Sequence, residues 1–192
     1  MSENDQFRKR GKELEDMFFS QEDARLTDQL NEQKEHHDQE LALKSISGIT
    51  NKSVLDNAID LGITVETFGA LTLIPLLKVA WADHICDIKE SKVILQFAEE
   101  AGLEKNSSGY KLLELWLENA INPNLYIAWK SYVEVLKEKL TPPEIEALHE
   151  EVIERARKVA RASGGFLGIG AISDEEACVL EALDILLTRE KS

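Results

Sequence analysis

Three carboxylates within eight residues form the strongest chemical signature in the chain. Asp83, Asp87 and Glu90 occur in the stretch Asp-His-Ile-Cys-Asp-Ile-Lys-Glu, which follows a long apolar segment. Clustered carboxylates repel one another unless a cation or water lies among them, and their oxygens are ligands that suit a hard divalent cation. The pattern predicts a metal site at Asp83, Asp87 and Glu90, with a divalent metal ion as the candidate cofactor.

A structural role competes with the metal role for two of these residues. Asp87 and Glu90 have the spacing of a capping box, in which an N-cap side chain and the third helical residue satisfy each other's backbone N–H groups. Only Asp83 is left without such a role. The stretch also lacks the alternating oxygen ligands and central glycine of an EF-hand loop. The residues alone leave both interpretations open.

Other catalytic chemistry finds little support in the sequence. Cys86 and Cys178 are far apart, and neither has a neighbouring His/Asp arrangement that would activate a thiol. The glycine-rich segment 164–170 lacks the Lys-Ser/Thr ending of a phosphate-binding loop. Enzymatic activity is therefore uncertain, and a non-enzymatic protein is favoured. A metal-dependent enzyme, the rival hypothesis, would need further ligands from residues 174–176, which are Asp174, Glu175 and Glu176.

Composition excludes several partners and locations. The net charge of −14 and the pI near 4.8 argue against nucleic acid, whose phosphates require clustered Lys and Arg. The longest apolar run, 68–82, is too short to span a bilayer and contains Pro75 and Lys78, so membrane insertion is not expected. Residues 1–16 carry charges throughout and show no secretion signal. Two isolated cysteines suit a reducing compartment, so the prediction is a cytoplasmic protein.

Helical periodicity and helix-capping patterns run through the whole chain, and no segment alternates with a period of two. Helices are expected over 51–61, where Gly62 ends the helix, and over 64–81, where Thr64 begins a central apolar helix kinked by Pro75. Capping signals at Asn122-Pro123, at Thr141–Glu144 and at Ser173–Glu176 begin later helices. The prediction is an all-α bundle of about seven helices over 46–192, preceded by an N-terminal helical arm over 1–45.

The arm is a separate functional candidate. Its apolar residues recur at helical intervals among many charges and begin next to a basic cluster, Arg8-Lys9-Arg10-Gly11-Lys12. An amphipathic helix that cannot bury its apolar side chains alone is expected to dock on its own bundle, on a second copy or on another protein. The residues predicted to bind a protein partner, or to mediate self-association, are Phe7, Leu14, Met17 and Phe18.

The stretch from Leu76 to Glu90 resembles the hallmark segment of the tellurite-resistance TerB-like family. In that family an apolar helix ends in Ala-Asp-Gly and is followed by an apolar residue, a short acidic turn and a glutamate. Here Ala82 and Asp83 match the pattern, and His84 replaces the glycine. The resemblance covers about 68–103 and implies an all-α bundle that acts in stress response and interacts with metal, without an established enzymatic activity.

An internal echo of the acidic turn occurs near the C-terminus. Ile172-Ser173-Asp174-Glu175-Glu176 repeats the order of an apolar residue, a capping residue and a glutamate that begins a helix. Two acidic helix starts could face each other across a pseudo-symmetric bundle. Two unrelated capping boxes explain the echo equally well.

Overall fold

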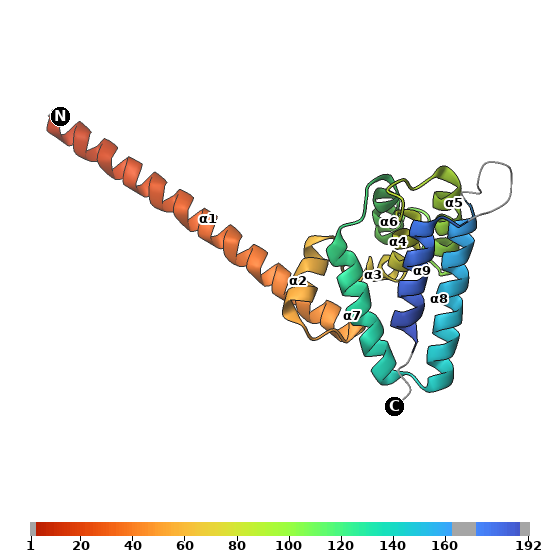
Figure 1. The fold of residues 1–192 in the computed structure, drawn as a ribbon. Coiled ribbons are helices and arrows are strands. Elements are labelled where there is room, and N and C mark those ends of the chain that lie inside the picture. The colour runs from red at the N-terminus through yellow and green to blue at the C-terminus, as the bar shows by residue number, and fades with distance from the viewer. Residues whose placement is uncertain (1–2, 163–171, 189–192) are drawn as a thin grey trace. The chain divides into compact units, whose positions relative to one another are not determined.

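The chain is all-helical over the residues that the structure, a computed structural model, describes. These are residues 3–162 and 172–188, excluding the side chains of 3–16, 19, 20 and 23. They form nine helices and contain no strand (Figure 1). The predicted all-α, multi-helix fold is confirmed. The glycine-rich segment 164–170 lies outside the described residues.

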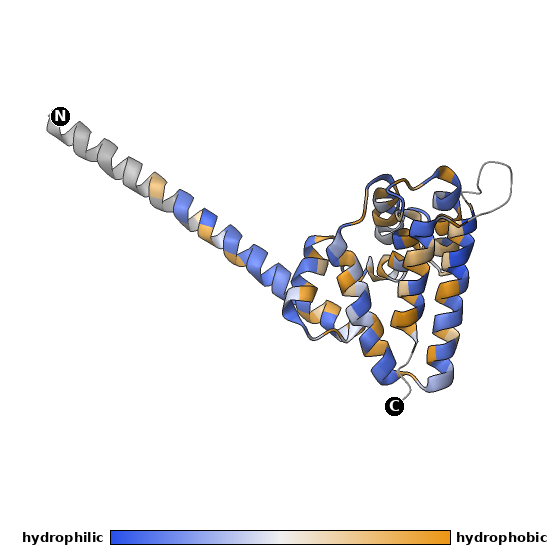
Figure 2. Ribbon diagram, in the orientation of Figure 1, coloured by the Kyte–Doolittle hydropathy of each residue, from blue (hydrophilic) through white to orange (hydrophobic). Residues whose placement is uncertain are grey.

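The chain divides into two compact units, Met1–Gln39 and Glu40–Ser192. The first unit consists of the N-terminal part of helix α1, which spans Glu3–Ser47. Figure 2 shows hydrophilic colouring along most of the described part of this helix, with isolated hydrophobic positions. The described part of this unit therefore has a regular helical backbone, and none of its described side chains is buried.

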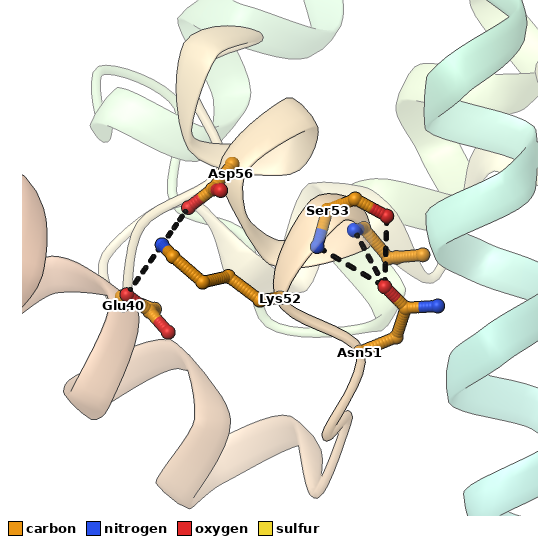
Figure 3. Close-up of polar contacts among 6 residues, drawn as sticks. Glu40, Asn51, Lys52, Ser53 and Asp56 are labelled. Atoms are coloured by element: carbon orange, nitrogen blue, oxygen red, sulfur yellow. Dashed lines mark hydrogen bonds and ion pairs between the residues drawn. The ribbon is translucent and has the colours of Figure 1, made fainter.

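The last residues of α1 belong to the second unit and are tied to helix α2, Lys52–Asp60. Leu43 is only 1% exposed, so this end of α1 contributes to the core. The Lys52 ammonium donates to Glu40 Oε2 at 2.9 Å and to Asp56 Oδ1 at 2.8 Å (Figure 3). The Asn51 side chain accepts from the first backbone N–H groups of α2, as expected of an N-cap.

The expected central helix over 64–81 is two helices. Helix α3 spans Phe68–Leu71 and α4 spans Ile74–Ala80, and Pro75 lies in the first turn of α4. Proline lacks an N–H and is favoured in a first turn, so it begins a new helix here instead of kinking one. Thr64 does not begin a helix: its N–H donates to the Thr67 hydroxyl at 2.8 Å.

Helix α4 is central to the second unit, as predicted. All of its residues except Lys78 are buried, and it packs against α7, Pro123–Lys139, α8, Pro142–Ala162, and α9, Asp174–Leu187. Helices α5, Ile88–Glu100, and α6, Ser108–Glu118, complete the bundle. The largest fully buried side chains are Leu43, Leu55, Ile63, Leu71, Leu73, Ile74, Leu77, Ile94, Leu113, Leu125, Leu183 and Leu187.

Several helix ends form as their sequences predict. Gly62 follows α2 with φ +87°, a conformation that glycine adopts without steric cost. The Asn122 side chain accepts from the N–H of Asn124 at 2.9 Å, and Pro123 is the first residue of α7. At the start of α8 the Glu144 carboxylate accepts from both the N–H and the hydroxyl of Thr141. Local capping chemistry thus sets these boundaries.

Candidate functional site

The start of α5 contains the capping box predicted for Asp87 and Glu90. Asp87 Oδ1 accepts from the N–H of Lys89 at 2.6 Å and from the N–H of Glu90 at 2.9 Å. In return, Glu90 Oε2 accepts from the N–H of Asp87 at 2.8 Å. Both carboxylates therefore already satisfy backbone donors that have no partner within the helix.

Asp83 also has a local role, which the sequence did not reveal. Its Oδ1 accepts from the N–H of Ile85 at 3.0 Å, closing a short turn after α4. Within this turn His84 has φ +70°, in the left-handed region. His84 thus adopts a conformation for which glycine is favoured, and the turn forms with histidine at this position.

Glu90 differs from an ordinary capping glutamate because it is buried. Its side chain is 3% exposed, and burial is the main cause that raises its pKa from 4.5 to about 7. The hydrogen bond from the backbone of Asp87 opposes this rise, and the negative charges of Asp87, Glu176 and Asp83 add to it. Glu90 thus releases its proton near neutral pH, while most carboxyl groups are ionised well below it.

The start of α9 repeats this arrangement. The Ser173 hydroxyl accepts from the N–H of Glu176 at 3.1 Å, and Glu176 Oε2 accepts from the N–H of Ser173 at 2.7 Å. Glu176 is 5% exposed, and its charge acts on Glu90. The echo seen in the sequence therefore corresponds to two buried glutamates that are close enough to interact. Asp174 and Glu175, by contrast, are exposed.

The described residues contain no group of three or more His, Cys, Asp or Glu side chains arranged to hold a metal ion. Of the three predicted ligands, Asp87 and Glu90 are engaged with backbone N–H groups and Asp83 with the N–H of Ile85. A cation at this turn would have to share these oxygens or displace their hydrogen bonds. Metal binding by Asp83, Asp87 and Glu90 stays a prediction.

The thiol in the turn is not activated. Cys86 Sγ lies 3.3 Å from the Ser91 hydroxyl oxygen, and burial raises the pKa of the Cys86 thiol. The nearby carboxylates raise it further, with Glu90 contributing most among them. A thiol whose pKa is raised holds less of the thiolate that reacts as a nucleophile. The geometry gives Cys86 a packing role.

One cavity among the described residues lies beside a histidine of α8. A cavity of about 480 Å³ runs along α8 and includes His149, Arg157, Arg161 and Asp184 in its lining. His149 Nε2 lies 2.8 Å from Asp184 Oδ1, a contact between residues 35 positions apart that no sequence pattern indicates. The described lining of this cavity includes no Ser, Thr or Cys beside the histidine.

The described apolar side chains of the arm are exposed. Met17 is 56% exposed, Phe18 63%, Leu26 45% and Leu30 65%. At about 100° per residue, Leu26 and Leu30 lie about 80° and 120° around the helix from Phe18. Apolar positions therefore wind around α1 and do not share one narrow stripe. The side chains of Phe7 and Leu14, predicted to bind a partner, lie outside those described.

Two exposed isoleucines of the acidic turn were missed by reasoning from sequence. Ile85 is 68% exposed and Ile88 is 74% exposed. In the sequence they look like the apolar residues that fill a core, because they continue an apolar segment with a spacing of three. Their exposure depends on where the turn lies on the bundle, which local spacing does not encode.

Comparisons of the chain with protein-family models, with curated proteins and with solved structures gave no match. The likeness to the TerB-like family therefore rests on the residues of the turn and its flanking helices, and the family stays a prediction. Among the described helices, none combines the length and the apolar character needed to cross a membrane.

Proposed function

We propose that the protein is a non-enzymatic interaction module whose N-terminal helix binds a protein partner. The observation that carries this proposal is the contrast between helical backbone and exposed apolar side chains in Met1–Gln39. Large apolar residues such as Phe18 and Leu30, at 63% and 65% exposed, are stabilised by burial at roughly 25 cal/mol per Å² of apolar surface removed from water. A partner that covers them provides that burial.

Helix physics supports the same proposal. Most helical stability in proteins comes from packing an apolar face against other elements, since the intrinsic propensity of each residue is small. The arm has local support from pairs such as Arg25 and Glu22, whose side chains form an ion pair one turn apart. Such exposed pairs contribute little, because water screens the attraction between their charges. A bound partner would therefore add most of the stabilisation available to this helix.

The experiment replaces exposed apolar side chains of the arm in the full chain. Met17→Ser with Phe18→Ser should shift the native complex, measured by size exclusion with light scattering, toward the mass of the single chain. The matched control is Leu115→Ser with Ile127→Ser, two residues of the second unit that are 53% and 44% exposed. If the arm variant elutes at the wild-type mass, the arm does not bind a partner and the proposal is wrong.

A metal-responsive stress protein, as the TerB-like resemblance implies, is a finer version of this proposal. Its support is the exposed Asp83 carboxylate beside two interacting buried glutamates. Calorimetric titration of divalent cations into the wild type and into Asp83→Ala tests it. Heat that disappears in the variant would support a metal role. Absence of heat, together with an unchanged melting temperature in the presence of metal, would leave the interaction module and remove the metal-dependent enzyme.

A further inference from the structure

The acidic turn combines apolar exposure with negative charge on one short stretch. Ile88, at 74%, has the highest exposure given for any large apolar residue of the described chain, and Ile85 is 68% exposed. Asp83 is exposed beside them. Single exposed apolar residues are common on proteins, but two within one turn form a small patch suited to contact. We call residues 83–88 the acidic-apolar turn.

The arm carries a segment of matching character. Arg8, Lys9, Arg10 and Lys12 lie within five residues that include no acid, in a chain whose net charge is −14. Phe7 precedes this cluster, and Leu14, Met17 and Phe18 follow it. We call residues 7–18 the basic-apolar segment. Its four bases all lie in residues 8–12, and its three acids, Glu13, Glu15 and Asp16, follow them. The cationic part of the segment therefore lies next to Phe7, as the carboxylates of the acidic-apolar turn lie next to its isoleucines.

We propose that the basic-apolar segment of one chain docks on the acidic-apolar turn of a second copy. This inference rests on the proposed function of the arm and identifies its partner. Opposite charges would steer the two surfaces together and fix their register, since complementary potentials act mainly on association rate and specificity. The isoleucines and the arm's apolar side chains would then remove one another from water.

The remainder of the arm favours this pairing over arm-to-arm pairing in parallel. Residues 19–40, which follow the basic-apolar segment, contain seven acids and only two bases, Arg25 and Lys34. Two arms side by side in parallel would place their basic clusters against each other and their acidic parts against each other, and like charges at contact distance are unfavourable. Contact between the basic-apolar segment and the acidic-apolar turn joins opposite charges.

A reciprocal exchange closes the assembly. If each chain donates its basic-apolar segment and accepts its partner's, the two contacts are related by a two-fold axis and no docking surface is left over. The contact is then used twice in one dimer. Two such contacts bury twice the area of one. The dimer therefore comes nearer to the ~1,200 Å² that specific, stable interfaces bury.

The test uses two full-length variants, one for each surface. The arm variant carries Lys9→Glu and Arg10→Glu. The turn variant carries Asp83→Asn, Ile85→Ser and Ile88→Ser, and Asn at 83 retains a side-chain oxygen that can accept from the N–H of residue 85. In sedimentation velocity, each variant alone should show a dimer dissociation constant at least tenfold higher than wild type. Circular dichroism confirms that each variant remains folded.

Mixing the two variants identifies the contact. The mixture contains one intact basic-apolar segment and one intact acidic-apolar turn on different chains, so a heterodimer should form with one of the two contacts restored. Raising the salt concentration should weaken it, because exposed charges are screened beyond ~10 Å at 0.1 M. The matched control is Ile185→Ser, which is 68% exposed on α9 and should leave dimerisation unchanged.

The outcomes separate this inference from the proposed function. If wild type stays monomeric at all concentrations while the arm still binds another protein, the second-copy contact is wrong and the proposed function stands. The contact with the turn is also wrong if the arm variant dimerises more weakly than wild type but the turn variant dimerises as wild type does. A mixture that fails to associate also overturns the contact between chains. If neither the charged nor the apolar arm substitutions alter any complex, both proposals fail.

Discussion

Both units of this chain are helical, but they differ in how far they bury their apolar side chains. In Glu40–Ser192, short helices bury leucines such as Leu77, which has no exposed surface. In Met1–Gln39, one long helix leaves leucines such as Leu30 65% exposed. The difference shows that helix formation and core formation are separate properties of a sequence. Helical periodicity predicted the helix of the first unit, and periodicity with capping patterns predicted those of the second. Among the described residues, only the second unit contains buried core side chains.

The largest predicted effect contrasts a core leucine with an arm leucine. Leu77→Ala removes a fully buried side chain at the centre of the bundle, and such substitutions cost about 2–5 kcal/mol of unfolding free energy. Leu30→Ala removes an exposed side chain and should change the unfolding free energy of the second unit by less than about 0.5 kcal/mol. Urea unfolding of both variants, followed by tryptophan fluorescence, measures the difference. Equal effects would mean that the two units do not differ in burial as described.

The pKa values of carboxyl groups also differ between the two units, because one unit leaves its described glutamates accessible to water and the other buries some of them. In the arm, a hydrogen bond from Arg25 lowers the pKa of the solvent-exposed Glu22. In the bundle, burial raises the pKa of Glu90 to about 7. One glutamate is held charged by a cationic neighbour, and the other resists ionisation because water cannot reach it. The pH dependence of stability should therefore originate in the second unit.

Glu90→Gln tests this difference. The carboxyl of Glu90 titrates near 7 in the folded chain and near its ordinary value of 4.5 when unfolded, so between these pH values the folded state binds more protons. Stability therefore falls as pH rises from about 4.5 to 7 and levels off above. At ~1.4 kcal/mol per unit of pKa difference, the loss is at most about 3.5 kcal/mol. Glutamine can occupy the same capping position and does not ionise, so the variant should lack this loss.

The measurement is urea unfolding of wild type and Glu90→Gln at pH 5 and pH 8. The unfolding free energy of the variant minus that of wild type should be larger at pH 8 than at pH 5. The matched control is Glu176→Gln, the same substitution at the equivalent position of the other capping box. Because the charge of Glu176 helps to raise the pKa of Glu90, this control should move the pH-dependent loss toward lower pH. Parallel profiles for wild type and Glu90→Gln would rule out Glu90 as the source.

A smaller effect is expected at the turn that precedes Glu90. His84 has φ +70°, and a non-glycine residue in this region costs roughly 1–2 kcal/mol of backbone strain. Glycine removes the strain, but it destabilises the fold by ~0.5–1 kcal/mol because it raises the conformational entropy of the unfolded chain. His84→Gly should therefore raise the unfolding free energy by up to about 1 kcal/mol. The control is Lys92→Gly, at an exposed position within α5, which should lower the unfolding free energy by about 1 kcal/mol. If both variants lower the unfolding free energy, the backbone strain at His84 is contradicted.

Sequence reasoning succeeded at most helix ends, where the determining interactions are local. Both capping boxes, at Asp87–Glu90 and Ser173–Glu176, involve residues three positions apart, and both form as predicted. Segment 64–81 was an exception, because Thr64 does not begin a helix and Pro75 lies at the start of a second one. The pattern was correctly read as apolar and central, but proline can either kink one helix or begin another, and the structure has it beginning α4.

Reasoning from sequence was weaker wherever burial decides. Nothing in the spacing of Glu90 separates a solvated capping residue from one that is 3% exposed with a pKa near 7. The exposure of Ile88 was equally hidden, since isoleucine is usually a core residue. Each case depends on which other helices pack beside the turn. That information is distributed over residues far apart in the chain, so one sequence without its fold does not contain it in readable form.

The smallest effect on the stability of the second unit is expected from deleting the first unit. Removing Met1–Gln39 takes away a unit with no core of its own and leaves the Lys52–Glu40 ion pair and the buried Leu43 in place. The melting temperature of the remaining 40–192 chain should stay within a few degrees of wild type at low protein concentration, where arm-mediated association is absent. At high concentration only the full chain should gain stability, because binding to the folded state raises its melting temperature by mass action. A collapse of the truncated chain at low concentration would mean that the arm contributes to the folding of the bundle, and the division into two energetically distinct units would be wrong.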